Sequence, residues 1–297
     1  MLFSMVAGAA TKQYSRNLTP FAGVDISGPF QVSLVRGSEY RALLSVEEAY
    51  IDYVVCSVSG SVLTLSLDER KVPSDVKKQF RGRTTPDPVF SAVIYVPDLL
   101  QSVTMSGKAV LQDTEDLFDK SRITFDLKGS STVKTISLSS LLLKVNMQNK
   151  ASADIRFVGK ECQVETANTA VLKISEESEK SRYSLSGGSK VTASSRTGSL
   201  SVHTKANCNM TLKGVGDSAL FDISGTSEVD ASAFEVPDAI VNMSSVCKLS
   251  EAAYRTLKVN LNGGSTLLFS GDPSVTIESI KSATMTRTGG SGNLTRL

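Results

Sequence analysis

One residue in this sequence could supply acid–base chemistry near neutral pH, and it is His203. The chain has 297 residues and a single histidine, which excludes any site that needs two imidazole rings. A Ser/His or Cys/His nucleophilic pair would have to use His203. The internal repeat described below places His203 beside Asp222 on adjacent coils, with Glu165 two coils away on the other side. Such a histidine–carboxylate pair suits general acid–base catalysis, whereas the structural interpretation of the same residues is a solvated polar ladder.

Other site chemistries find little support. The cysteines are Cys56, Cys162, Cys208 and Cys247. Their spacing matches no CxxC metal pattern, no acidic cluster recurs, and no phosphate-binding glycine loop precedes a helix, so we predict no metal and no cofactor. The 32 basic and 30 acidic residues give a net charge of +2, which argues against a nucleic-acid binder. No apolar run approaches the ~18 residues of a membrane span.

A short pattern recurs from residue 103 onward, at intervals of about 19 residues. Each instance reads apolar-x-apolar, three turn-like residues, then small-x-apolar, so the apolar period is two, as in a strand. The interval is too short for a helical hairpin or a propeller blade, and it predicts a parallel β-solenoid of about ten coils. The instances begin at Val103, Phe125, Val145, Val164, Tyr183, Val202, Phe221, Val241, Val259 and Val275.

The repeat predicts columns of inward side chains, the first formed by these starting residues. The second column is Met105, Leu127, Met147, Thr166, Leu185, Thr204, Ile223, Met243, Leu261 and Ile277. A third column of small residues is expected at an inside corner: Ala109, Ser131, Ala151, Ala170, Ser189, Cys208, Ser227, Cys247 and Ser265, broken at Lys281. Cys208 and Cys247 would lie two coils apart, at ~9.6 Å, which is too far for a disulfide, so we expect buried free thiols. Glycine or asparagine fills most central turn positions, where a positive φ is tolerated.

Residues 21–102 show strand signals of another kind. Alternating apolar residues predict strands at 24–26, 30–35, 42–46, 53–58, 62–67 and 89–96, which would form the first coils or an N-terminal β cap. A charged insertion at 68–88 interrupts them, and Ser74 is expected to cap a short helix that ends at Phe80. A solvated loop is favoured there over an anion site.

The two ends of the chain are expected to lie outside the repeat. Residues 1–10, MLFSMVAGAA, resemble the apolar and small-residue parts of a truncated signal peptide, the alternative being a frayed N-terminus. We expect a linker at 11–20, solenoid repeats at 103–288 and a glycine-rich tail at 289–297.

The segment FAGVDISGPFQVSLVRG at 21–37 resembles the opening motif of the putative auto-transporter adhesin, head GIN domain family. VLTLSL at 62–67 and AVIYVPDLLQSVTMSGKAVL at 92–111 resemble its later segments. The resemblance covers residues 21–297 and implies a single-stranded, right-handed parallel β-helix that follows a signal peptide in Bacteroidetes-type bacteria. The family has no established catalytic residues, so none is carried over to this chain.

The leading hypothesis is therefore a non-catalytic, exported module of the periplasm, outer-membrane surface or extracellular space, with an adhesin-like binding or structural role. Its partner would be a surface glycan or an envelope protein, with no nucleic acid and no transmembrane span. The alternative is a polysaccharide-active enzyme on a β-helix scaffold, with His203, Asp222 and Glu165 as the weak candidate residues. A third interpretation is a scaffold that assembles into oligomers.

Overall fold

The structure is a computed structural model that describes residues 11–81 and 87–288. The expected signal segment at 1–10 and the tail at 289–297 lie outside these described residues. The chain is all-β, a β-solenoid of about ten turns spaced about 19 residues apart, as the repeat predicts. It divides into two compact units, residues 1–119 with 126–134 and residues 120–125 with 135–297, which are described in turn.

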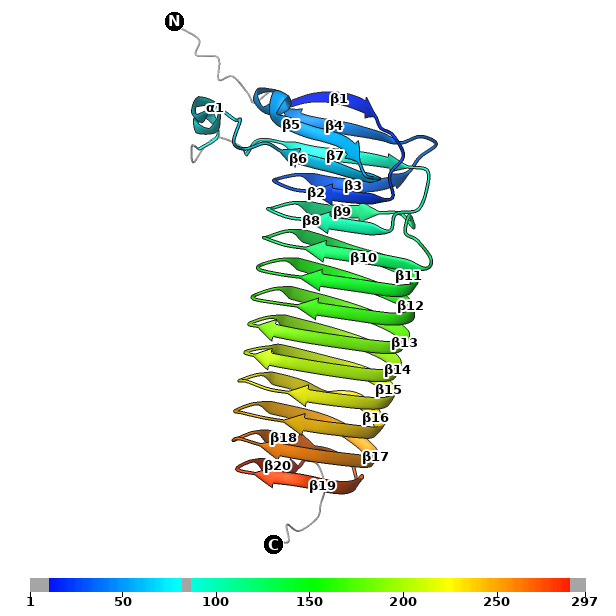
Figure 1. Ribbon diagram of the computed structural model, residues 1–297, viewed down its shortest axis with the longest axis vertical. Coiled ribbons are helices and arrows are strands. Elements are labelled where there is room, and N and C mark those ends of the chain that lie inside the picture. Colours follow the sequence, from blue (N-terminus) through cyan, green and yellow to red (C-terminus); the bar gives the residue numbers. More distant parts are fainter. Residues whose placement is uncertain (1–10, 82–86, 289–297) are drawn as a thin grey trace, which may run out of the picture. The chain divides into compact units, whose positions relative to one another are not determined.

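The first unit combines parallel coils with antiparallel strands. Its strands are β1 (Thr11–Asn17), β2 (Gly23–Ile26), β3 (Gln31–Arg36), β4 (Arg41–Glu47), β5 (Val54–Ser59), β6 (Val62–Leu67), β7 (Phe90–Val96), β8 (Ser102–Met105) and β9 (Val110–Thr114). Strand β2 pairs in parallel with both β6 and β8, and β3 with both β7 and β9. The coil β2–β3 therefore lies between coils that come later in the chain (Figure 1).

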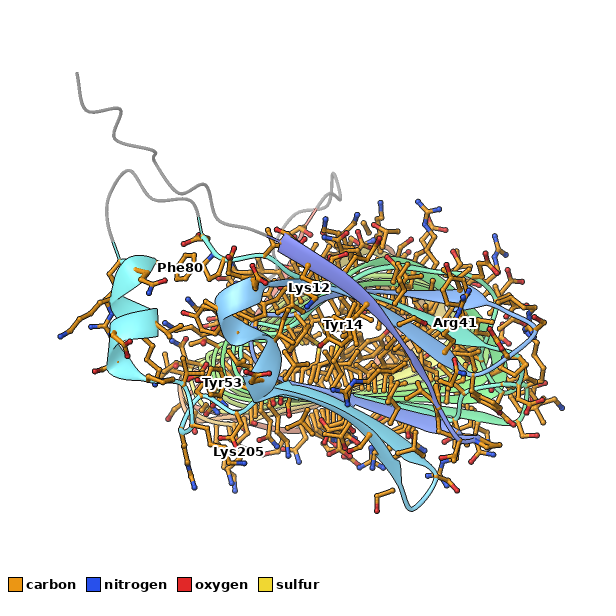
Figure 2. The ribbon with its side chains drawn as sticks, turned by 90° about the horizontal axis from the view of Figure 1, so that it is seen from above. Lys12, Tyr14, Arg41, Tyr53, Phe80 and Lys205 are labelled. Atoms are coloured by element: carbon orange, nitrogen blue, oxygen red, sulfur yellow. The ribbon has the colours of Figure 1, made fainter. Side chains whose placement is uncertain are left out.

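The six strands expected between residues 24 and 96 are all present, as β2 to β7. The linker expected at 11–20 is wrong for its first part, because Thr11–Asn17 forms β1 and pairs antiparallel with β4, from Thr11 opposite Glu47 to Asn17 opposite Arg41. Most side chains of β1, such as that of Lys12, are exposed, whereas Tyr14 is half-buried (Figure 2). Backbone pairing rather than apolar burial holds this strand, so it leaves no alternating signal. The role of residues 21–102 as an N-terminal cap stays a prediction.

The charged insertion contains the short helix α1 (Ser74–Gln79). Ser74 is its first residue rather than its cap: the N-cap is Pro73, and no side chain accepts a hydrogen bond from the helix start. Phe80 follows the helix and packs on Tyr50 of the 3-10 helix η1 (Glu48–Tyr53), with ring centroids 5.5 Å apart (Figure 2). One aromatic contact thus joins the insertion to the unit's core.

The second unit is a stack of parallel coils (Figure 1). Strands β10 (Arg122–Leu127) and β11 (Thr132–Met147) contribute residues to both units. The following strands are β12 (Ser152–Thr166), β13 (Val171–Gly187), β14 (Lys190–Ala206), β15 (Asn209–Ile223), β16 (Glu228–Met243), β17 (Lys248–Asn262), β18 (Thr266–Phe269), β19 (Ser274–Lys281) and β20 (Thr284–Arg287). Each long strand from β12 to β17 forms most of one coil and pairs in parallel with the next, with register shifts in the β15–β16 and β16–β17 pairs.

The predicted inward columns are confirmed through the ninth repeat, where every member is buried. Cys208 and Cys247 are free and buried, as expected for the small corner column. The tenth repeat was placed in the wrong register. Val275 pairs with Leu257 and Ile277 pairs with Val259, and both side chains are exposed, at 37% and 57%. The predicted register is off by two residues, and a slip of two leaves the alternation of apolar residues unchanged, so an alternating pattern cannot reveal it.

The central turn positions form a column of residues with positive φ. The glycines and asparagines expected there adopt φ values near +60° to +80°: Gly107, Gly129, Asn149, Asn168, Gly187, Gly225 and Gly263. Ala206 takes the same conformation, with φ 77°, and pairs with Gly187 of the preceding coil. An alanine Cβ is strained in this left-handed region, whereas glycine is not.

Substitutions at this turn should have opposite effects on stability. Ala206→Gly should raise the free energy of unfolding by about 0.5–1 kcal/mol, because it relieves the strain of a left-handed alanine. Gly187→Ala should lower it by about 1–3 kcal/mol, because a Cβ would lie 2.7 Å from the Asn168 amide nitrogen in a strained conformation. Urea unfolding of the full chain measures both, and effects of the same sign would contradict the argument.

Glu251 is a buried carboxyl group on β17. Its Oε2 accepts a hydrogen bond from the Ala253 amide at 2.8 Å, while Oε1 has no hydrogen-bond partner in the described part of the chain. Burial raises the pKa of Glu251 to about 7, and the Ala253 amide opposes that rise. The folded state therefore holds a proton that the unfolded chain releases near pH 4.5.

Stability should consequently fall as the pH rises from about 4.5 through 7. A shift of this size corresponds to a loss on the order of 3 kcal/mol above pH 7. Glu251→Gln should remove this part of the pH dependence, because an amide does not titrate. Unfolding midpoints between pH 5 and 8 check this, with the exposed Glu228→Gln as control. Parallel curves for the wild type and Glu251→Gln would refute the assignment.

Candidate functional site

A row of polar side chains lies on the outside of the second unit. One residue of each strand from β12 to β17 stands in register with the next. The members are Glu165, Ser184, His203, Asp222, Asn242 and Asn260, here called the polar ladder. The residues on either side of a ladder residue, such as Val202 and Thr204, are buried. Because side chains alternate between the two faces of a strand, the ladder residues point outward.

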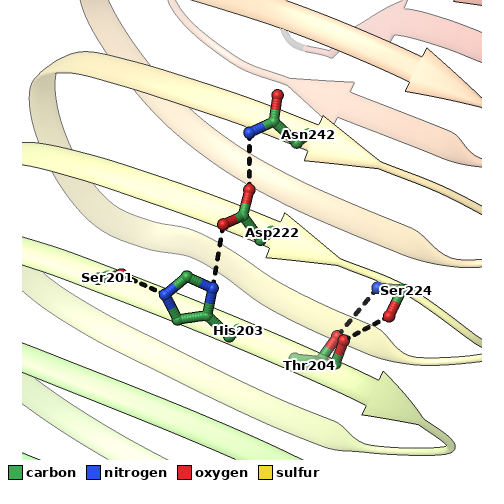
Figure 3. A network of polar contacts seen from close by, with 6 residues as sticks. All are labelled: Ser201, His203, Thr204, Asp222, Ser224 and Asn242. Atoms are coloured by element: carbon green, nitrogen blue, oxygen red, sulfur yellow. Dashed lines mark hydrogen bonds and ion pairs between the residues drawn. The ribbon is translucent and has the colours of Figure 1, made fainter.

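A chain of hydrogen bonds runs through the middle of the polar ladder (Figure 3). His203 Nδ1 lies 3.0 Å from Asp222 Oδ2, and Ser201 Oγ lies 2.8 Å from His203 Nε2. Asn242 Nδ2 donates to the other carboxylate oxygen of Asp222 at 2.6 Å. Because a carboxylate only accepts, Nδ1 carries the proton of the neutral ring. Nε2 is then the acceptor, and Ser201 donates to it.

The structure brings together two of the three residues that the sequence singled out. His203 and Asp222 are in contact on β14 and β15. Glu165 stands two coils from His203, separated by Ser184, and its carboxylate lies 3.9 Å from the Lys144 ammonium group. Sequence reasoning missed Ser201, although a residue two before His203 on one strand must face the same side.

A shallow hollow of about 450 Å³ lies beside this chain of hydrogen bonds. Lys205 and the two asparagines of the last ladder coils supply polar groups to it, and Asn262 Nδ2 donates to Asn260 Oδ1 at 3.0 Å. The described residues contain no group of three or more His, Cys, Asp and Glu side chains that could hold a metal ion. The hollow can therefore offer directional hydrogen bonds and one cation to a polar ligand.

A second polar cluster is buried inside the coils of β12 to β14. Glu176 Oε1 accepts hydrogen bonds from the Tyr183 hydroxyl at 2.7 Å and from Ser195 Oγ at 2.8 Å. Glu176 Oε2 accepts a hydrogen bond from Ser178 Oγ at 3.2 Å. Burial, reinforced by the Glu176 charge, raises the pKa of Tyr183 and of the Cys162 thiol well above their usual ranges. Both groups stay protonated, so the cluster satisfies a buried carboxylate rather than providing a nucleophile.

None of the helices among the described residues is both long and apolar enough to cross a membrane.

Two solved structures share this fold. A putative adhesin from Parabacteroides merdae ATCC 43184 is 15% identical with a TM-score of 0.52, and the alignment covers 94% of this chain and 96% of that chain. A putative adhesin from Parabacteroides distasonis ATCC 8503 is 13% identical with a TM-score of 0.51, covering 95% and 98%. At these identities the likeness concerns the fold alone. No curated protein sequence matches the chain.

The family comparison is more direct. The sequence model described as "Putative auto-transporter adhesin, head GIN domain" matches residues 20–197 and, in a second overlapping match, residues 163–273. Together the two matches span most of the chain and both compact units. The resemblance predicted from residues 21–37 is thereby confirmed, and the protein belongs to the putative auto-transporter adhesin, head GIN domain family.

Proposed function

We propose that this protein is a non-catalytic, exported module of the cell envelope or cell surface that binds a surface glycan through the polar ladder. Membership of the adhesin-like family supports a surface or exported location. The likeness of its fold to two proteins described as putative adhesins is consistent with that role.

The proposal rests on the hydrogen bonds that hold side chains of the polar ladder in place. Ladder positions repeat at the coil spacing of about 4.8 Å, so donors and acceptors recur at a fixed distance along the stack. Asp222 is held by His203 and by Asn242, and Asn260 by Asn262. Side chains already fixed by their neighbours lose little entropy when they bind sugar hydroxyl groups.

Substitution in the polar ladder should weaken glycan binding. The full chain is applied to an array of bacterial and host surface glycans, and the bound glycan is then titrated by calorimetry. Asn242→Ala should weaken binding about tenfold, because it removes a donor and releases Asp222. Asn209→Ala, at the exposed start of β15, serves as the control. A chain that binds no glycan, or whose Asn242→Ala variant binds as the wild type does, would argue against this function.

A hydrolytic enzyme is the second candidate function, favoured by the connectivity of Ser201, His203 and Asp222. Ser201 Oγ donates to Nε2 and Asp222 receives Nδ1–H, the arrangement by which a serine attacks an ester carbonyl while His203 takes its proton. His203 would then protonate the leaving alkoxide, and water would release the acyl group. The strand amides of β14 pair with neighbouring coils, so they supply no ready oxyanion site. The enzyme therefore ranks second.

Covalent labelling separates the two functions. A non-catalytic module should not react with a fluorophosphonate probe above the level of its Ser201→Ala variant, since the strand amides of β14 are paired with neighbouring coils and are not free to stabilise the addition. The wild type, Ser201→Ala and Ser184→Ala are treated together and analysed by intact mass. Labelling of the wild type and Ser184→Ala, lost in Ser201→Ala, would establish the hydrolase instead.

A further inference from the structure

We propose that a groove crossing strands β12 to β17 binds a lysine- or arginine-bearing extended segment of a partner protein. The groove occupies a different part of each coil from the polar ladder: on β14 it involves residues 196–198, whereas the ladder residue is His203. It encloses about 560 Å³ and is lined by Val158, Gly159, Glu177, Ser178, Glu179, Arg196, Thr197, Gly198, Val215, Gly216, Asp217, Glu235 and Tyr254.

Three of the residues that line this groove are glycines that the packing of the coils requires. A Cβ on Gly159 would collide with the Ser140 carbonyl oxygen, and one on Gly216 would lie 2.7 Å from the Phe234 ring. A Cβ on Gly198 would lie 2.8 Å from the Glu179 carbonyl oxygen. The backbones of successive coils are therefore so close at this corner that no larger residue fits without a shift.

The charge of the groove is opposite to that of the whole chain. Four carboxylates and one guanidinium group line it, in a protein whose net charge is +2. Glu179 pairs with Lys160 at 3.5 Å. Within the described part of the chain, Glu177, Asp217 and Glu235 form no ion pair. These carboxylates are not grouped as metal ligands, so they suit dispersed ammonium or guanidinium groups better than a metal ion.

Apolar surface between the carboxylates fits the stems of such side chains. Tyr254 is 59% exposed and Val158 is 57% exposed, and both line the groove. A lysine or arginine side chain packs its methylene stem on apolar surface and keeps its charged end near carboxylates. The Tyr254 ring adds a face on which a cation can stack.

The direction of the groove indicates a peptide rather than a single amine. The three carboxylates without an ion pair among the described residues and the tyrosine lie on four different strands: Glu177 on β13, Asp217 on β15, Glu235 on β16 and Tyr254 on β17. Six coils at about 4.8 Å spacing extend about 24 Å, which equals about seven residues of an extended chain at 3.3 Å each. A basic segment of that length can place several cations against these carboxylates together.

Fluorescence anisotropy tests the proposal with the full chain. The probe is a fluorescein-labelled decapeptide of alternating lysine and serine, and its comparison peptide has norleucine in place of lysine. We expect binding of the lysine peptide alone, weakening with salt as screened charge pairs do. The double variant Asp217→Asn with Glu235→Gln should weaken binding at least tenfold. Tyr254→Ala should weaken it about threefold, while Tyr254→Phe retains affinity because the ring face remains.

A matched control separates the effect of the groove carboxylates on affinity from the effect of the protein's net charge. Glu228→Gln changes an exposed carboxylate on the same strand as Glu235 but outside the groove, and should leave the affinity unchanged. Equal losses in Glu228→Gln and in the groove variants would overturn the proposal, as would equal binding of the norleucine peptide or no binding of the lysine peptide. A glycan-array signal abolished by the groove variants would overturn it too, whereas one abolished only by Asn242→Ala supports two separate surfaces.

Discussion

Parallel pairing in register between successive coils is the constraint on which the rest of the second unit depends. Once Val164 pairs with Tyr183, and Tyr183 with Val202, all the remaining residues of those strands lie over their counterparts about 19 residues away. Each repeated residue type then becomes a row. Inward rows are the apolar columns and the small corner column, while outward rows are the polar ladder and the edges of the groove. A side chain in this fold therefore acts mainly through its neighbours one coil above and below.

The same constraint explains how far the sequence could predict the fold. Alternation of apolar residues and a small residue at a fixed offset were enough to predict nine repeats, because those features follow directly from the interior of a narrow coil. A slip of two residues leaves the alternation unchanged, so the repeat starting at Val275 was misplaced. It also does not specify partners, so the position of the β2–β3 coil between β6–β7 and β8–β9 could not be foreseen.

The two surface sites differed in how well the sequence revealed them. The contact of His203 with Asp222 follows from the register, and Ser201 could have been added from the strand period. The groove could not be predicted from the sequence. The repeat identifies the glycines of the turn column, whose conformation has positive φ, but Gly159, Gly198 and Gly216 lie outside that column, and the sequence does not show how closely the coils approach one another there.

Buried carboxylates show the cost and the use of polar groups inside such a stack. Glu176 lies beside hydroxyl groups of its own coil and of the next, Tyr183 and Ser195, and both donate to it. Among the described residues, Glu251 accepts a hydrogen bond only from the Ala253 amide, and burial accordingly raises its pKa. A polar residue enters the interior cheaply only where the neighbouring coil supplies a donor. Ser178 and Thr197 belong to the cluster around Glu176 and also line the groove, so the buried cluster and the groove share these two residues.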